Sequence, residues 1–160
     1  RPYHRVLRHP GWDVRRWEEA FDTVSDCLSW QRIEAGAPAP SSVGHVHVHT
    51  AEQSWALTWN KGLQTAGAVD AYLLQEHLFQ RIFGISDARN DPRLKYAPGT
   101  LDSAGLKAEC AGQPGQALFE LHSVTPEQLM HTADRGGFLP PKSTWIEPKL
   151  RSGLFIHEIQ

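Results

Sequence analysis

Residues 43–59, VGHVHVHTAEQSWALTW, contain the clearest strand pattern in the chain. The runs 43–50 and 55–59 are rich in valine, threonine and tryptophan, and a short polar turn separates them. Two such runs joined by a few polar residues predict a β-hairpin. We therefore expect an antiparallel sheet around this hairpin.

Two helices are expected beside the hairpin. The first covers residues 14–28, with Asp13 as its N-cap. Its apolar face comprises Trp17, Phe21, Val24 and Leu28. The second covers residues 70–83, and Gly84 is its expected end because glycine adopts the left-handed conformation that closes many helices. Residues 35–42 are expected to form a loop, and residues 87–99 are expected to be rich in turns.

Short strands and two further helices are expected elsewhere. Residues 3–7, 117–121 and 153–159 have strand patterns, and a weak helix is expected over 103–110. Thr125, Pro126 and Gln128 fit the N-cap, first position and capping box of a helix that ends at 136–137. Strands and helices do not alternate strictly. The expected fold class is therefore α+β, with a mixed, largely antiparallel sheet flanked by three to four helices.

Composition limits the class of protein. A chain of 160 residues that is 40% hydrophobic can bury one core, so residues 1–160 are expected to form a single domain. A net charge of -2 argues against a nucleic-acid partner, which selects a basic surface. No apolar run approaches the roughly 20 residues of a membrane span, so no membrane partner is expected. With two cysteines and no secretory signal, the expected location is cytoplasmic.

Three histidines in the hairpin are candidate metal ligands. His45, His47 and His49 alternate with valines, so they share one face of a strand. Histidines two residues apart can reach one ion, and imidazole suits zinc, copper, iron or nickel, which makes His45 and His47 the candidate pair. His45 and His49 lie roughly 13 Å apart along a strand, so a third ligand is expected from elsewhere. Candidates for it are His77, His122 and His157. The alternative is an exposed face that happens to be histidine.

A turn of alternating charge follows the second helix. It contains Asp87, Arg89, Asp91, Arg93 and Lys95. The Asp91-Pro92 pair favours a turn, and Asp87 can cap local amides. Two acids and three bases within nine residues can hold a phosphate and a metal ion together. The alternative is a solvated turn held by salt bridges.

Residues 140–156 combine prolines with cations and hydroxyls. Proline fixes the backbone, so this segment is expected to be rigid, with Trp145 buried as its anchor. Arginine and lysine bind phosphate, and hydroxyls add neutral donors. The predicted anion ligands are Lys142, Ser143, Thr144, Lys149, Arg151 and Ser152, bordered by His4 and Arg5 if the first and last strands are neighbours. The alternative is a stiff hairpin in which Glu147 pairs with a neighbouring cation.

Several stretches occur in the order of one known family. They are residues 2–6, 74–76, 82–85 and 87–93 and, most specifically, residues 141–154, PKSTWIEPKLRSGL. Together they resemble the C-terminal region of the bacterial and archaeal family catalogued as Domain of Unknown Function 1015. Members are more than twice this length, and their front half resembles the nucleotide pocket of ParB-like and sulfiredoxin-like proteins. Some proteins of that wider group are kinases of free serine. The resemblance, with a chain that starts at Arg1, implies a C-terminal fragment whose partner is the N-terminal half of the same protein.

Two functions follow. In the first, the chain is part of a phosphotransfer-type enzyme that uses Mg²⁺ with a nucleotide and acts on a small metabolite such as a free hydroxy amino acid. Its catalytic residues would be His4, Asp91 and Arg93, and Arg5 would join the anion ligands. In the second, it is a non-catalytic ligand-binding or regulatory domain for an anionic metabolite. The enzyme requires a carboxylate close to the cations of the 142–151 segment.

Overall fold

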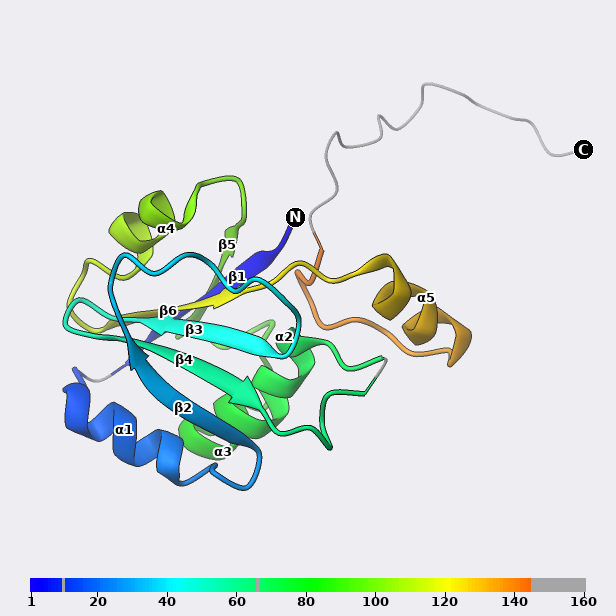
Figure 1. The fold of residues 1–160 in the computed structure, drawn as a ribbon, viewed down its shortest axis with the longest axis horizontal. Coiled ribbons are helices and arrows are strands. Elements are labelled where there is room, and N and C mark those ends of the chain that lie inside the picture. Colours follow the sequence, from blue (N-terminus) through cyan, green and yellow to red (C-terminus); the bar gives the residue numbers. More distant parts are fainter. Residues whose placement is uncertain (10, 66, 145–160) are drawn as a thin grey trace, which may run out of the picture.

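The computed structural model describes residues 1–9, 11–65 and 67–144. In this part of the chain a six-stranded sheet has the order β2-β4-β3-β6-β1-β5, and all neighbouring strands are antiparallel (Figure 1). The strands are β1 (Tyr3–Arg8), β2 (Leu28–Ile33), β3 (His45–His49), β4 (Ser54–Trp59), β5 (Leu94–Pro98) and β6 (Gln116–Leu121). The predicted α+β class and antiparallel sheet are confirmed.

Four helical segments flank the sheet within these residues. They are α1 (Val14–Asp22), the continuous run α2 (Asp70–Leu73), η1 (Leu74–Phe79) and α3 (Gln80–Phe83), α4 (Ser103–Cys110) and α5 (Pro126–Asp134). In Figure 1, α1 and the α2–α3 run lie on one side of the sheet, α4 lies on the other, and α5 lies beyond one end of the strands. In the described ranges, no helix has the length and apolar character needed to cross a membrane.

The predicted hairpin is formed by β3 and β4, with His45 opposite Thr58 and His49 opposite Ser54. The residues between the histidines, Val46 and Val48, are fully buried in the main core. That core lies between the sheet and the α1 and α2–α3 helices. It includes Trp17, Phe21, Trp55, Leu57, Leu74, Leu78 and Phe119. The histidines therefore point to the other face of the sheet.

The first helix is shorter than predicted. Asp13 caps α1 as expected, with its side chain accepting from the Arg16 amide, but the helix ends at Asp22 and β2 begins at Leu28. Leu28 fits the helical spacing and is buried, yet its segment pairs with β4 over six residues. The prediction of helix to residue 28 was wrong because Leu28 is equally suited to a strand, and tertiary pairing decided its state. Strand β5, in the region expected to be turns, is likewise formed by pairing with β1.

The remaining described elements match the predictions. The helix over 70–83 contains a π-helical turn in η1 and closes at Gly84, which has a φ of +63°. Thr125 and Gln128 form the predicted capping box at the start of α5. Helix α4 occupies the predicted span. The strand expected over 153–159 and the anchor Trp145 lie outside the described residues.

Candidate functional site

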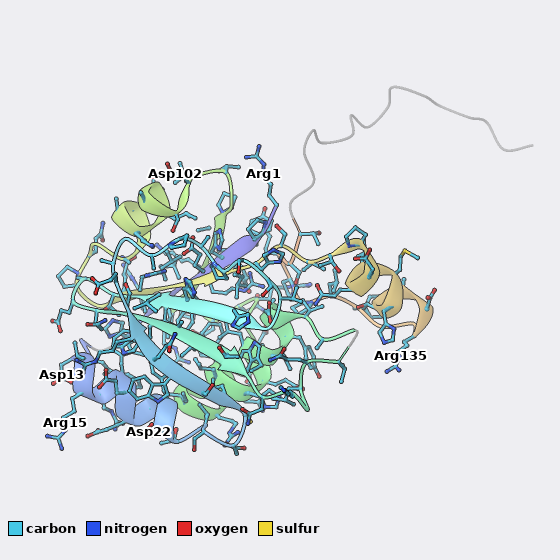
Figure 2. All side chains as sticks on the ribbon, viewed as in Figure 1. Arg1, Asp13, Arg15, Asp22, Asp102 and Arg135 are labelled. Atoms are coloured by element: carbon cyan, nitrogen blue, oxygen red, sulfur yellow. The ribbon has the colours of Figure 1, made fainter. Side chains whose placement is uncertain are left out.

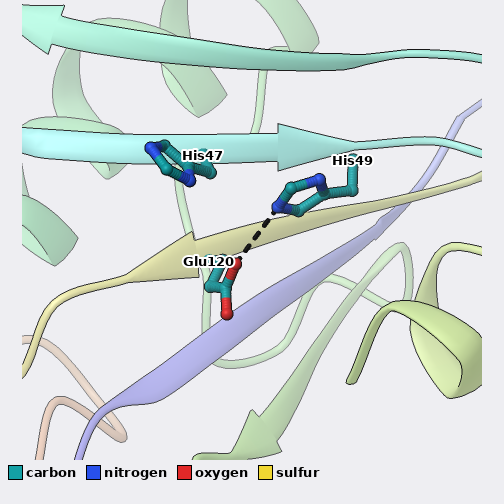
Figure 3. Close-up of side chains that lie close together, drawn as sticks. All are labelled: His47, His49 and Glu120. Carbon is teal, nitrogen blue, oxygen red and sulfur yellow. Dashed lines mark hydrogen bonds and ion pairs between the residues drawn. The ribbon is translucent and has the colours of Figure 1, made fainter. Parts of the chain in front are cut away.

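The face of the sheet opposite the main core carries a polar cluster beside an apolar one. Helix α4 covers part of this face, where Leu106 packs with Val6 and Leu118. Next to that contact, β3 presents His47 and His49 and β6 presents Glu120, as Figure 3 shows. Glu120 is the register partner of His47, so the pairing of β3 with β6 brings the carboxylate to the histidines. We call these three residues the histidine–glutamate cluster.

The cluster is compact and largely closed to solvent. One ligand atom from each of the three side chains lies within 4.8 Å of the other two. His49 Nε2 lies 3.1 Å from Glu120 Oε2 (Figure 3). His49 and Glu120 are each 1% exposed, whereas His47 is half-buried. Solvent therefore approaches the cluster from the His47 side.

Two serines hold the buried members in place. The Ser54 hydroxyl lies 2.8 Å from His49 Nδ1, and the Ser103 hydroxyl donates to Glu120 Oε2 over 3.2 Å. His47 differs, because its Nδ1 is buried and has no hydrogen-bond partner in the described part of the chain. A buried polar nitrogen without a partner is costly, so its position calls for an explanation.

Electrostatics favour an ionised Glu120 beside a neutral His47. Burial alone would raise the pKa of Glu120, but hydrogen bonds from His49 and Ser103 outweigh it and the pKa lies below its ordinary value. Burial, and then the neighbouring His49, lowers the pKa of His47. At pH 7 the cluster thus contains an ionised carboxylate and a neutral His47, the protonation states that metal ligation requires.

Ser54, His49 and Glu120 also have the connectivity of a hydrolase triad. None of the three is more than 4% exposed, however, so the Ser54 hydroxyl cannot meet a substrate carbonyl. Nucleophilic catalysis needs an accessible nucleophile. We assign these contacts to the support of the cluster.

The predicted metal pair is only partly reproduced by this geometry. His47 lies in the cluster, but His45, at the start of β3, lies outside it, and its Nδ1 is 3.1 Å from the Thr58 hydroxyl. His49 takes the place that was given to His45, and Glu120 supplies the third ligand expected from elsewhere. Glu120 is 71 residues from His49 in sequence, and no local pattern links them.

His4 also lies on this face of the sheet. It is 3% exposed, and its Nδ1 accepts the amide of Leu121 at 3.1 Å. Burial lowers the pKa of His4 to about 4, against the raising effect of Glu120. A neutral, buried imidazole that serves a strand amide differs from the catalytic role predicted for His4.

The predicted catalytic turn pairs its own charges. Arg93 Nε and Nη2 reach the two oxygens of Asp91 at 2.9 and 2.6 Å, and Arg93 Nη1 donates to the Phe83 carbonyl. This arrangement matches the salt-bridged alternative. Arg93 adjoins Arg8 at one end of β1, whereas Thr144 bridges Pro2 at the other. The two ends are roughly 20 Å apart at about 3.3 Å per residue, so Asp91 and Arg93 do not converge with residues 142–144.

Arg5 binds the 140–144 segment to strand β1. Its Nη1 donates to the carbonyls of Tyr3 and Lys142 at 3.0 Å, and its Nη2 donates to the Pro141 carbonyl at 3.1 Å. The guanidinium lies 4.7 Å from the Tyr96 ring centroid, and Arg5 is only 3% exposed. Its donors are thus used by backbone, which differs from the predicted anion contact.

Two other predicted anion ligands are also held locally. Ser143 is buried, and its hydroxyl donates to the Pro140 carbonyl at 2.6 Å. Lys142 is exposed, with its Nζ 5.6 Å from the Tyr3 ring centroid. Thr144 is exposed. Lys149, Arg151 and Ser152 lie outside the described residues, so their convergence stays a prediction.

An open groove adjoins this segment. Two cavities of about 410 and 470 Å³ share Tyr72, Phe138, Leu139 and Pro140 in their walls. The larger is also lined by the turn at 86–90, and the smaller by residues of α2, η1 and α5. Phe138 is 94% exposed, which is unusual for so large an apolar side chain. We call the two cavities together the Phe138 groove.

Charged side chains border both parts of the groove. Arg89 and Asp87 line the larger cavity, and Arg135 and Glu76 line the smaller one. The Asp87 oxygens accept from the Asn90 side chain and from the Arg89 amide, and these bonds lower the pKa of Asp87. No ion pair joins the Arg89 or Arg135 side chain to another residue in the described ranges. Two cations are thus available beside exposed aromatic surface.

A cysteine–histidine contact was not anticipated from the sequence. Cys27 Sγ lies 3.5 Å from His77 Nδ1 and 2.9 Å from Arg81 Nη1, with Asp26 binding the same arginine. Burial raises the pKa of Cys27, and Asp26 raises it further. The thiol therefore stays protonated at neutral pH and is a poor nucleophile.

Comparison of the chain with family models, with curated proteins and with solved structures yields no match.

Proposed function

We propose that the chain binds a small anionic metabolite, with a phosphate- or nucleotide-linked group, in the Phe138 groove. The observation that carries this proposal is the groove itself, which is bounded both by the 86–90 turn and by the segment that leads into Lys142, Ser143 and Thr144. These two regions are about fifty residues apart in the sequence. Cavities of this size suit small ligands, whose sites are mostly apolar with a few placed polar groups.

The groove offers complementary chemistry to the two parts of a nucleotide. The exposed faces of Tyr72 and Phe138 can stack against a base, a contact worth about 1–3 kcal/mol per base. Arg89 and Arg135 can each bind phosphate oxygens, because guanidinium donors match that geometry. The ionised Asp87 retains lone pairs that can bind Mg²⁺ beside the phosphates.

We place this binding within a phosphotransfer-type enzyme that acts on a small metabolite such as a free hydroxy amino acid. The proposal includes membership of the Domain of Unknown Function 1015 family and the N-terminal half of the same protein as the partner. Of the two acids of the turn that can hold a metal ion, we assign this role to Asp87, because Asp91 is engaged with Arg93. The second candidate function is a non-catalytic ligand-binding domain. The Asp91–Arg93 ion pair favours it, because these two predicted catalytic residues bind each other.

Binding is tested with the chain itself. ATP with Mg²⁺, ADP, phosphoserine and inorganic phosphate are titrated by calorimetry against the wild type, Arg89→Ala, Arg135→Ala and Phe138→Ala. Each arginine loss should weaken nucleotide binding about ten- to 100-fold, since a charged hydrogen bond is worth about 1.5–3 kcal/mol. Arg15→Ala is the control, because Arg15 on α1 lies at the opposite end of the view from Arg135 (Figure 2).

Equal affinity in the wild type and all three groove variants would exclude the groove. The reaction is tested in a longer protein that includes the N-terminal half, supplied with γ-labelled ATP and free serine. The enzyme proposal requires label transfer that Asp87→Asn abolishes while nucleotide binding persists. Nucleotide binding without transfer in the longer protein would support the non-catalytic domain instead.

A further inference from the structure

The donor atoms of the histidine–glutamate cluster are spaced almost as a metal site requires. Zinc–nitrogen and zinc–oxygen bonds of about 2.0–2.2 Å place neighbouring ligand atoms of a tetrahedron roughly 3.3–3.5 Å apart. His49 Nε2 and Glu120 Oε2 are already 3.1 Å apart. The widest separation in the cluster is within 4.8 Å, so a shift of about 1.5 Å closes it. The half-buried His47 has the most freedom to make that shift.

The hydrogen bonds around the cluster are those of oriented metal ligands. Metal-binding histidines generally use their second ring nitrogen to bond a neighbouring group, and ligating carboxylates are also hydrogen-bonded. Ser54 serves His49 in this way, and Ser103 serves Glu120. If His49 Nε2 binds an ion, Nδ1 carries the ring proton and donates to Ser54, whose hydroxyl can accept as well as donate.

The unpartnered nitrogen of His47 is an independent observation. Its Nδ1 is buried without a hydrogen-bond partner in the described residues, whereas both ring nitrogens of His49, on the same strand, have a partner. An ion bound through Nδ1 would supply what that atom lacks. Three observations thus point to a bound metal ion. They are the unpartnered Nδ1 of His47, the compact set of donor atoms and the two serines that bind His49 and Glu120.

We propose that His47, His49 and Glu120 form a binding site for a divalent first-row transition-metal ion, with zinc as the reference ion. Two imidazoles and one carboxylate suit such ions, whereas magnesium and calcium prefer oxygen ligands throughout. Three protein ligands leave a fourth position for water, which the partial exposure of His47 allows. The nearby cation Lys107 does not block the site, since its Nζ is bound by the carbonyls of Ala35 and Ala37.

The test uses the chain without a histidine tag, stripped of metal with a chelator. Cobalt(II) is titrated while its visible absorption bands are recorded, and zinc is then added to displace it. One equivalent of cobalt should bind with the strong bands of a four-coordinate site, and one equivalent of zinc should remove them. Loss of a supporting group costs about 10–100-fold in metal affinity, so loss of a ligand should cost more than about 100-fold.

The variants are Glu120→Gln, which keeps the side-chain shape, and His47→Gln at the half-buried position. The matched control is His45→Gln, because His45 lies on the same strand and the same face outside the cluster. Circular dichroism and urea unfolding identify the folded variants, and His47→Gln decides the outcome if Glu120→Gln does not fold. Both ligand variants should lose the site, and the control should keep it.

Three results would overturn the proposal. The first is a folded wild type that binds no stoichiometric cobalt or zinc. The second is undiminished affinity in the folded ligand variants. The third is a loss in His45→Gln as large as that in His47→Gln, which would assign the binding to the His45–His47 pair instead.

Discussion

Asp70 offers a sharp test of the buried polar groups in this fold. It is the first residue of α2, and its carboxylate, 5% exposed, accepts the amide of Gly44 at 2.9 Å. This bond ties the start of β3 to the helix. Burial nevertheless raises the pKa of Asp70 from 3.8 to about 6, because loss of water outweighs the bond from Gly44.

The raised pKa has a defined consequence for stability. The folded state holds the proton of Asp70 more tightly than the unfolded state, so Asp70 favours folding most below pH 3.8. That advantage is lost as the pH rises through about 6. The gap between 3.8 and about 6 corresponds to about 3 kcal/mol at about 1.36 kcal/mol per pKa unit. Asp70→Asn keeps an oxygen for the Gly44 amide and removes the ionisation.

Urea unfolding of the wild type and Asp70→Asn should therefore be compared from pH 3 to pH 8. The variant's free energy of unfolding, relative to the wild type, should rise by about 3 kcal/mol between pH 3 and pH 7 and then level off. A relative stability that is flat or falling over this window would refute the reasoning.

Asp91→Asn is a control of opposite sign. The hydrogen bond from Arg93 lowers the pKa of Asp91, so this carboxylate stabilises the fold above its ordinary pKa and loses that effect in acid. The variant should be less stable than the wild type at neutral pH, and the difference should shrink only below about pH 4. Opposite trends in the two variants would separate burial from ion pairing as causes of the pH dependence.

Two further predictions concern β1. In His4→Asn, the asparagine Oδ1 can still accept the Leu121 amide, but the titrating imidazole is gone. The free energy of unfolding of the wild type should fall by about 3 kcal/mol as the pH falls from 6.5 to about 4. Urea unfolding of the metal-free variant should lack that loss. Arg5→Met should lower the free energy of unfolding by about 3 kcal/mol and speed proteolysis after residue 138, because three hydrogen bonds to carbonyls and the stacking on Tyr96 are lost. Wild-type behaviour in both assays would show that these contacts are dispensable.

The sequence predicted elements best where one local signal was strong. The alternation in residues 43–59 defined the β3–β4 hairpin, and the Thr125 capping box defined the start of α5. β2 and β5 were missed because their order comes from pairing with distant strands. Charge patterns were less informative about function. Arg5 and Arg93 are suitable anion ligands by type, and only the fold shows that backbone carbonyls and Asp91 use their donors.

The position of the histidine–glutamate cluster is set by apolar packing on the opposite face of the sheet. Val46, Val48 and Phe119 face the main core, and their burial sets the register of β3 against β6. A slip by one residue would turn every side chain of the strand to the other face, so it would expose these apolar residues. The register that protects the core also places Glu120 opposite His47. The cluster therefore needs no local sequence motif, which is why the predicted histidine pair included only His47 of the three donors and missed the carboxylate.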